Sequence, residues 1–331
     1  MKKISSIVTG GAGFIGSNLV DKLVSKGHFV TVIDNLSTGR LSNISHHNKK
    51  NVKFINIDIS KSKKLSKIIK GHSFVFHLAG LADIVPSIEN PEKYINANVI
   101  GTINLLKACK NLNIKKFIYA ASASCYGIPS KYPTNENSKL DPKYPYALTK
   151  LLGEELVMHW SHVYNMPNIS LRFFNVYGLR SRTTGAYGAV FGVFLAQKLA
   201  NKPLTVVGNG KQTRDFIHIR DLVDVIYKAS IKKNLKGKIF NLGSGKETTV
   251  NEIAKIIGGK KINVPKRPGE PERSMADISK IKKELGWKPK VPIKMGVHEL
   301  LKNINNWSDA PVWTPKLISR ATKTWFKLLK K

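Results

Sequence analysis

The start of the chain most constrains its fold, because an apolar run at Ile4–Val8 leads directly into a glycine-rich turn and an amphipathic segment. The turn, residues 9–16, reads TGGAGFIG, with glycines in a G-x-x-G-x-x-G pattern. Gly10 permits a tight strand-to-helix turn, Gly13 lets the backbone approach a pyrophosphate, and Gly16 lets the helix lie close to the sheet. Free amides and the dipole at the helix N-terminus favour a bound anion. The sequence therefore predicts a dinucleotide site.

A carboxylate follows the second apolar strand, Phe29–Ile33. Asp34 can accept hydrogen bonds from both ribose hydroxyls of NAD and would repel the phosphate of NADP. The alternative, a glycine-rich turn without a ligand, does not explain why a strand, a helix and an acidic residue occur in this order. The predicted cofactor is therefore NAD.

Composition excludes several classes of protein. The 331 residues are 42% hydrophobic, enough to bury a large core, and carry a formal net charge of +34. The lysines are scattered and accompany many Asn and Ile residues, which indicates a solvated basic surface. Because no aromatic-interleaved or recognition-helix motif accompanies the charge, we expect no nucleic-acid partner.

The cellular compartment is predicted from the cysteines and from apolar segments. Cys109 and Cys125 are the only cysteines, which argues against a disulfide framework. No secretory h-region and no run of membrane-spanning length is recognisable. We therefore expect a cytoplasmic protein.

Strand-length apolar runs alternate with helical periodicity along the first half of the chain. The runs occur at 4–9, 29–33, 52–57, 74–78, 116–121 and 169–174, and helical segments include 93–111 and 146–163. This alternation predicts an α/β fold: a Rossmann-like, doubly wound parallel sheet with helices on both faces.

The second half, punctuated by Pro and Gly, predicts a smaller, discontinuous α/β domain for the substrate. Helices are expected at 187–201, 250–257 and 278–285, and strands at 216–219 and 239–242 that return to the first domain. The expected domains are 1–178 plus about 215–242 for NAD, about 179–214 and 243–306 for the substrate, and a basic tail at 307–331.

Tyr146 and Lys150 are four residues apart, on one face of a predicted helix. A free tyrosine titrates near ~10 and is a poor base at neutral pH. A neighbouring ammonium and a positive nicotinamide both favour the phenolate, so we expect a lowered pKa and a base at Tyr146. The same spacing is also typical of a packed ring and a solvated cation, and only the surrounding motifs distinguish the two.

Those motifs occur in a characteristic order. Ser122 lies in AASASCYG (120–127), after an apolar strand whose carboxyl end is where such sheets bind ligands. HLAG is found at 77–80, RFFNVYG at 172–178 and GNGKQTRDF at 208–216. Together these segments resemble the extended short-chain dehydrogenase/reductase superfamily, and within it the UDP-hexose 4-epimerase family, from about residue 4 to 306.

The resemblance implies a role for each matching residue. Tyr146 would be the catalytic base, Lys150 the group that lowers its pKa, and Ser122, assisted by Ser124, the partner of the sugar oxygen. The implied cofactor residues are Gly10, Gly13, Phe14, Ile15, Gly16, Asp34, Asn35, Asp58, Ile59, Leu78, Ala79, Gly80, Asn98, Tyr146 and Lys150. The implied substrate residues are Ser87, Ser122, Tyr146, Asn175, Ala189, Val190, Arg214, Arg267, Glu270 and Ser274. No metal ligand is implied.

The implied reaction is NAD-dependent epimerisation at C4 of a UDP-hexose through a 4-keto sugar. The 4,6-dehydratases of the superfamily carry an acidic pair after the serine, whereas this chain has Ala123-Ser124, which disfavours elimination. Ser274 stands where the family's gatekeeper is a bulky Tyr in enzymes restricted to glucose and galactose. A serine there favours UDP-GlcNAc/UDP-GalNAc over UDP-Glc/UDP-Gal, unless another side chain narrows the pocket. Another NDP-sugar epimerase, and a non-catalytic nucleotide-binding scaffold, are the alternatives.

The last segment, 315–331, predicts an amphipathic helix that is apolar on one side and basic on the other. Its apolar residues are Leu317, Ile318, Ala321, Trp325, Leu328 and Leu329. In one alternative this helix lies peripherally on an anionic membrane, at the inner face, with Trp325 at the interface. In the other it packs on the enzyme or on its dimer partner. The resemblance also suggests a homodimer through the helices of 93–111 and 143–163.

Overall fold

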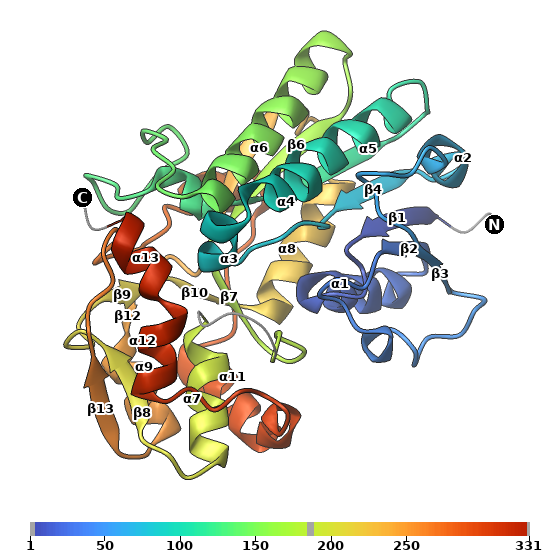
Figure 1. Ribbon diagram of the computed structural model, residues 1–331. Coiled ribbons are helices and arrows are strands. Elements are labelled where there is room, and N and C mark those ends of the chain that lie inside the picture. Colours follow the sequence, from blue (N-terminus) through green and yellow to red (C-terminus); the bar gives the residue numbers. More distant parts are fainter. Residues whose placement is uncertain (1–3, 184–188, 330–331) are drawn as a thin grey trace.

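A computed structural model describes residues 4–183 and 189–329 and shows a seven-stranded, all-parallel sheet (Figure 1). The strand order is β11-β6-β5-β4-β1-β2-β3. The bounds are β1 (Ser5–Thr9), β2 (Phe29–Asp34), β3 (Val52–Asn56), β4 (Phe74–His77), β5 (Lys116–Ser122), β6 (Asn168–Phe173) and β11 (Lys238–Leu242). The predicted α/β fold with a doubly wound parallel sheet is confirmed.

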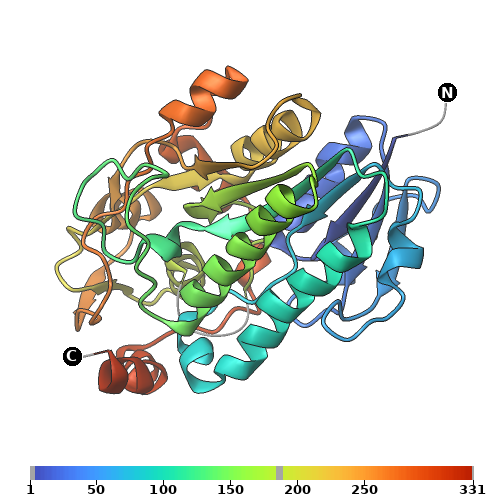
Figure 2. The ribbon, with the colours of Figure 1, turned by 90° about the horizontal axis from the view of Figure 1, so that it is seen from above.

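Helices cover both faces of this sheet (Figure 2). One face carries α1 (Phe14–Ser25) and α8 (Ile219–Ile231), and the other carries α2 (Leu65–Ile69), α5 (Gly101–Cys109) and α6 (Pro145–Val163). Successive strand residues point to opposite faces. Val8 accordingly packs in the core under α1, and the adjacent Ile7 packs in the core under α5.

The single helix expected at 93–111 is interrupted in the structure. It begins as α4 (Pro91–Ile95), widens into a π-helical turn, η2 (Asn96–Ile100), and continues as α5. The buried side chain of Asn98 lies in this turn, where it donates to Leu81 O (3.0 Å) and accepts from Leu81 N (2.8 Å). The turn thus fixes the loop between β4 and the short helix α3 (Ile84–Glu89).

The smaller lobe has its own core, built around Phe194, Ile253, Leu300 and Trp307. It contains α7 (Val190–Leu199), β8 (Leu204–Val207), β9 (Thr213–Arg214), β12 (Thr248–Thr249), α9 (Val250–Ile257), β13 (Lys261–Val264), α11 (Ile293–Lys302) and η4 (Ile304–Trp307). β13 pairs with β8, and β12 with β9. α10 (Ser279–Leu285) packs beside β11.

The two predicted returning strands end up in different sheets. β11 joins the edge of the main sheet next to β6. β10 (Phe216–His218) instead pairs with β7 (Asn175–Tyr177) in a separate two-stranded sheet between the lobes. Two short 3-10 turns, η1 (Leu41–Asn43) and η3 (Ala123–Tyr126), complete the loops near the carboxyl ends of β2 and β5.

The predicted C-terminal helix is a pair of short helices, α12 (Pro315–Ala321) and α13 (Lys323–Leu328). Part of their apolar side faces the protein: Ile318 and Trp325 are only 5% and 3% exposed, whereas Leu317 and Leu328 are 46% and 51% exposed. Packing on the enzyme is therefore the alternative that the structure supports, and Trp325 is not available at a membrane interface as the lipid alternative required. Among the described helices, none is long and apolar enough to cross a membrane.

Candidate active site

A cavity of about 630 Å³ opens at the carboxyl ends of the parallel strands, where sheets of this kind bind ligands. The predicted cofactor residues that line it are Gly10, Gly13, Phe14, Ile15, Gly16, Asp34, Asn35, Asp58, Ile59, Leu78, Ala79, Gly80, Tyr146 and Lys150. Asn98 is the one that does not. Residues that follow four strands thus meet two residues of the helix at Pro145–Val163 in one cavity.

The glycine turn approaches its neighbours too closely for side chains. Gly10 has φ +69°, a left-handed conformation, and a Cβ there would lie 2.7 Å from the backbone nitrogen of Ala79. A Cβ on Gly16 would clash with the carbonyl oxygen of Gly10. α1 begins at Phe14, so its N-terminal amides lie at the cavity. This turn fits the pyrophosphate of a dinucleotide.

Asp34 lines the cavity at the end of β2, with its carboxylate held by backbone amides. Oδ2 accepts from Ala12 N (3.0 Å) and Oδ1 from Leu36 N (2.8 Å). Burial raises the pKa of Asp34, and these backbone hydrogen bonds act against that rise. Asn35 donates to Asp58 Oδ2 at 3.3 Å, which joins the ends of β2 and β3. The arrangement fits the adenosine ribose of NAD.

Tyr146 is half-buried in the first turn of α6, where its hydroxyl hydrogen-bonds with Ser122 and Ser124. Ser122 ends β5, and its Oγ accepts from Ser124 Oγ (2.8 Å) and from Ser124 N (3.2 Å). The structure therefore brings three of the predicted catalytic hydroxyls into one hydrogen-bonded group. Such a group can hold a sugar hydroxyl and exchange its proton.

Lys150 lies one turn further along α6 and is buried, with Nζ 4.3 Å from the ring centroid of Tyr119. Burial lowers the pKa of Lys150 to about 7, against the opposing charge of Glu154. Burial also raises the pKa of Tyr146, and the hydrogen bonds from the two serines only partly compensate. Desolvation is the largest cause at both side chains, so the lowering of the pKa of Tyr146 by Lys150 and a bound nicotinamide stays a prediction.

Three predicted substrate residues form a charged cluster on the smaller-lobe side. Arg214 Nη2 donates to Glu270 Oε1 at 2.6 Å, and Arg267 Nη1 lies 3.7 Å from Glu270 Oε2. The half-buried Tyr144 links this cluster to the catalytic tyrosine: its ring centroid is 6.3 Å from that of Tyr146, and the charges of Glu270 and Arg214 both act on its pKa. The cluster thus lies next to the group of catalytic hydroxyls.

The other substrate residues in the described part of the chain are not among those that line the cavity. The backbone N–H of Asn175, at the start of β7, donates to Asp215 O (3.0 Å). Ala189 precedes α7 as its N-cap residue, and Val190 begins the helix. Ser274 is half-buried beside Met275, whose carbonyl accepts from Thr134 N (2.8 Å).

Two predicted residues are not placed to touch a ligand directly. Asn98 is 1% exposed and its amide is engaged by Leu81 and Thr149, so it supports the loop after β4 from behind. Ser87 is fully buried, and its hydroxyl donates to Ile84 O (2.6 Å) within α3. Both assignments are corrected to structural support, because burial leaves neither side chain free to reach the cavity.

The cavity also contains residues that sequence reasoning missed. Phe173 ends β6 beside β5, and applying the strand-end rule to every strand would have found it. Lys93 lines the cavity from α4. No sequence signal distinguishes it from the many surface lysines.

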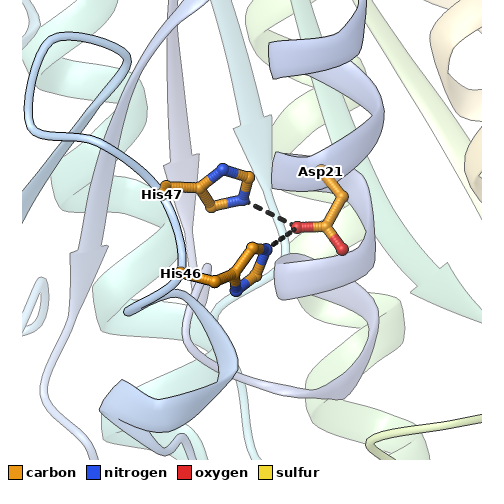
Figure 3. Close-up of side chains that lie close together, drawn as sticks. All are labelled: Asp21, His46 and His47. Atoms are coloured by element: carbon orange, nitrogen blue, oxygen red, sulfur yellow. Dashed lines mark hydrogen bonds and ion pairs between the residues drawn. The ribbon is translucent and has the colours of Figure 1, made fainter.

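A second cluster lies outside the cavity. His46 and His47 direct their Nε2 atoms at Oδ1 of Asp21 on α1, at 3.0 and 2.7 Å (Figure 3). Two imidazoles and a carboxylate can hold a metal ion. However, Oδ2 of the same carboxylate is paired with Arg180 Nη2 at 2.8 Å. Both carboxylate oxygens are thus engaged, and the cluster ties two loops to α1.

Comparisons with known proteins agree with this geometry. A family model described as GDP-mannose 4,6 dehydratase matches residues 7–300. The chain is 38% identical over 310 residues to a putative UDP-glucose 4-epimerase of Methanocaldococcus jannaschii, covering 91% of this chain and 97% of that protein. The sequence motifs predicted a class of enzyme that combines a Rossmann-like sheet and a glycine turn with catalytic tyrosine, lysine and serine residues. The chain belongs to the extended short-chain dehydrogenase/reductase superfamily, in its NAD-dependent epimerase/dehydratase family.

Two solved structures are similar over nearly all of their length. The UDP-N-acetylglucosamine 4-epimerase of Methanobrevibacter ruminantium M1, in complex with UDP-N-acetylmuramic acid, is 32% identical with a TM-score of 0.85, over 92% of this chain and 100% of that chain. The UDP-glucuronic acid 4-epimerase of Bacillus cereus, in complex with UDP-glucuronic acid and NAD, is 32% identical with a TM-score of 0.85, over 92% and 99%.

Proposed function

We propose that this chain is an NAD-dependent 4-epimerase of a UDP-hexose that works through a 4-keto sugar. The hydrogen-bonded group of Tyr146, Ser122 and Ser124, whose tyrosine lines the dinucleotide cavity, carries the proposal. Solved relatives named as 4-epimerases of three different UDP-sugars share about a third of the sequence with this chain, which supports the reaction type more than any one sugar.

NAD, when bound, accepts the hydride from C4 and later returns it. Tyr146 takes the proton of the 4-hydroxyl, and Ser122 and Ser124 hold the sugar oxygen through the hydrogen bonds that they share with it. Because burial raises the pKa of Tyr146, the positive charge of a bound nicotinamide would favour the phenolate against that rise. Tyr146 would therefore remove the proton of the sugar only while the nicotinamide is oxidised and positive. It would return that proton once the nicotinamide has become neutral.

The charged cluster suits the diphosphate of the nucleotide sugar. Arginine forks bind phosphate oxygens in pairs, and Glu270 holds Arg214 and Arg267 in fixed positions. Elimination in the manner of a dehydratase is disfavoured, because η3 offers Ala123 and Ser124 rather than carboxyl groups beside Ser122. The half-buried Ser274 supports UDP-GlcNAc/UDP-GalNAc as the favoured pair, with UDP-Glc/UDP-Gal as the second.

A cytoplasmic homodimer is part of the proposal. The helices named for the dimer expose an unusual set of large apolar side chains, namely Ile95 (44%), Ile100 (39%), Leu148 (46%) and Leu152 (41%). Exposed apolar patches of this kind mark contact surfaces. Sedimentation of the purified protein, with Leu152→Glu as the disrupting variant, tests the assembly. A wild-type monomer would refute it.

One assay tests the reaction. The purified protein is given UDP-GlcNAc, UDP-glucose and UDP-glucuronic acid separately, the epimers are resolved by chromatography, and bound NAD is read by absorbance. We expect bound NAD and interconversion of UDP-GlcNAc with UDP-GalNAc. An inert UDP-GlcNAc beside a fully active UDP-glucose would refute the acetylated pair, and inertness toward all three would refute the epimerase.

A further inference from the structure

The C-terminal helix pair, α12 and α13, contacts segments on both sides of the candidate site. α13 packs against α3 (Figure 1), and Thr324 Oγ1 donates to Glu89 Oε1 at the end of α3, at 3.0 Å. Trp325 Nε1 donates to the carbonyl oxygen of Pro268 at 2.7 Å. Glu89 ends the helix that follows the cavity loop, and Pro268 follows Arg267. The helix pair thus connects the cofactor side to the substrate side.

Trp325 makes two contacts to the same short segment. Its indole is 3% exposed, and the guanidinium carbon of Arg267 lies 5.4 Å from the ring centroid, within cation–π range. The hydrogen bond to Pro268 O fixes the next residue of the chain. Nη1 of the same guanidinium group lies 3.7 Å from Oε2 of Glu270. Both the backbone and the side chain of Arg267 are therefore constrained by the tail.

We infer that Trp325 is a positioning residue that holds Arg267 ready for a sugar diphosphate. This inference rests on the proposed function, which assigns Arg267 to that diphosphate. A guanidinium group that is already packed loses less side-chain freedom when a ligand binds. The helix pair therefore raises affinity for the nucleotide and leaves proton transfer at Tyr146 unchanged. It lies beyond residue 300, where the family match ends.

The test compares three variants of the full-length, NAD-loaded protein. Trp325→Ala removes both contacts, Trp325→Phe keeps an aromatic face but loses the Nε1 donor, and Leu328→Ala alters a 51% exposed side chain of the same helix. Titration calorimetry with UDP measures the dissociation constant, and steady-state assays separate KM from kcat. We expect UDP to bind about tenfold more weakly to Trp325→Ala and about threefold more weakly to Trp325→Phe. The Leu328→Ala control should match the wild type, and kcat and NAD content should not change.

A double-mutant cycle shows whether Trp325 acts through Arg267. In an Arg267→Ala background, Trp325→Ala should cost little further UDP affinity, because the group that it positions is gone. Equal losses in both backgrounds would overturn the inference, as would a Trp325→Ala variant that binds UDP like Leu328→Ala. If the Trp325→Ala variant does not fold, the double-mutant cycle with Arg267→Ala is measured with Trp325→Phe instead. A wild type that binds no UDP would overturn the proposed function itself, whereas tight wild-type binding with an inert Trp325 would overturn only the inference.

Discussion

The cofactor side of the cavity is made of backbone turns at strand ends, whereas its substrate side is made of long charged side chains on loops of the smaller lobe. Gly10 and Gly16 leave no room for even one carbon atom, and Asp34 is held by backbone amides. Arg214 and Arg267 instead share one ion-pair partner, Glu270, and Arg267 also contacts Trp325 of the tail.

This difference predicts how the two sides respond to substitution. A turn whose neighbours are backbone atoms of the sheet cannot relax, so a change there should abolish cofactor binding. Long side chains in a polar cluster can rearrange, so changes there should alter affinity and specificity in steps. The catalytic tyrosine lies where the two sides meet.

Tyr146→Phe should have the largest effect on turnover. The ring keeps its packing in α6, but the hydroxyl that exchanges a proton with the sugar is lost, so kcat should fall by about 10²–10⁴-fold. NAD content should be unchanged, because the glycine turn and Asp34 are intact. Epimerisation assays and absorbance of bound NAD check both statements, and undiminished turnover would sink the assignment of Tyr146 as the base.

Gly10→Ala tests the rigidity of the cofactor side. The new Cβ would lie 2.7 Å from Ala79 N in a left-handed conformation, so we expect purified protein without bound NAD. Gly27→Ala is the matched control, because Gly27 has φ +80° but nothing within 4 Å of an added Cβ. It should lose about 1 kcal/mol of stability and keep its NAD. Equal NAD content in the two variants would refute the tight-turn explanation.

The difference between backbone turns on the cofactor side and side-chain contacts on the substrate side also explains which features the sequence could predict. A strand, a glycine turn and a terminal carboxylate are local patterns, so Gly10, Gly16 and Asp34 were found and all line one cavity. Helical spacing predicted the buried Ile318 and Trp325, but neither the exposure of Leu317 and Leu328 nor the contact with Pro268. Contacts between distant segments leave no local signal.

Burial accounts for the remaining differences. Sequence matching placed Asn98 and Ser87 at a ligand, although both are fully enclosed. The π-helical turn that directs Asn98 inward cannot be recognised from residue periodicity. Lys150 and Tyr146 were paired by their spacing and by the surrounding motifs, whereas the desolvation that acts on the pKa of both groups is revealed only by the folded chain.

Ser274→Tyr tests the stepwise response of the substrate side. A bulky ring should exclude the 2-acetamido group and lower kcat/KM for UDP-GlcNAc by about 100-fold, while any UDP-glucose activity changes less than about threefold. Ser274→Ala, which keeps the space open, is the control and should turn over both sugars like the wild type. A parallel loss for both sugars in Ser274→Tyr would mean that position 274 does not select at the acetamido group.

The smallest effect concerns a histidine buried beneath the glycine turn. His77 bonds to the hydroxyls of Thr9 (2.8 Å) and Thr102 (2.9 Å), and burial lowers its pKa from 6.5 to about 3. Thr102 donates its own hydroxyl proton to Asn98 O, so His77 Nε2 is the donor to Thr102 and Nδ1 accepts from Thr9. An added proton on Nδ1 would therefore break that bond.

Below pH 6.5 the unfolded chain protonates this imidazole but the folded protein does not, so stability falls as the pH decreases toward 3. His77→Gln cannot take up that proton. Between pH 6.5 and 5.5 the wild type should lose about 1 kcal/mol more unfolding free energy than the variant. Urea unfolding at the two pH values measures the difference, with the exposed His159→Gln as the control that should follow the wild type. Equal pH slopes for wild type and His77→Gln would mean that the rigid cofactor side tolerates a charge beneath its turn, contrary to the comparison of the two sides.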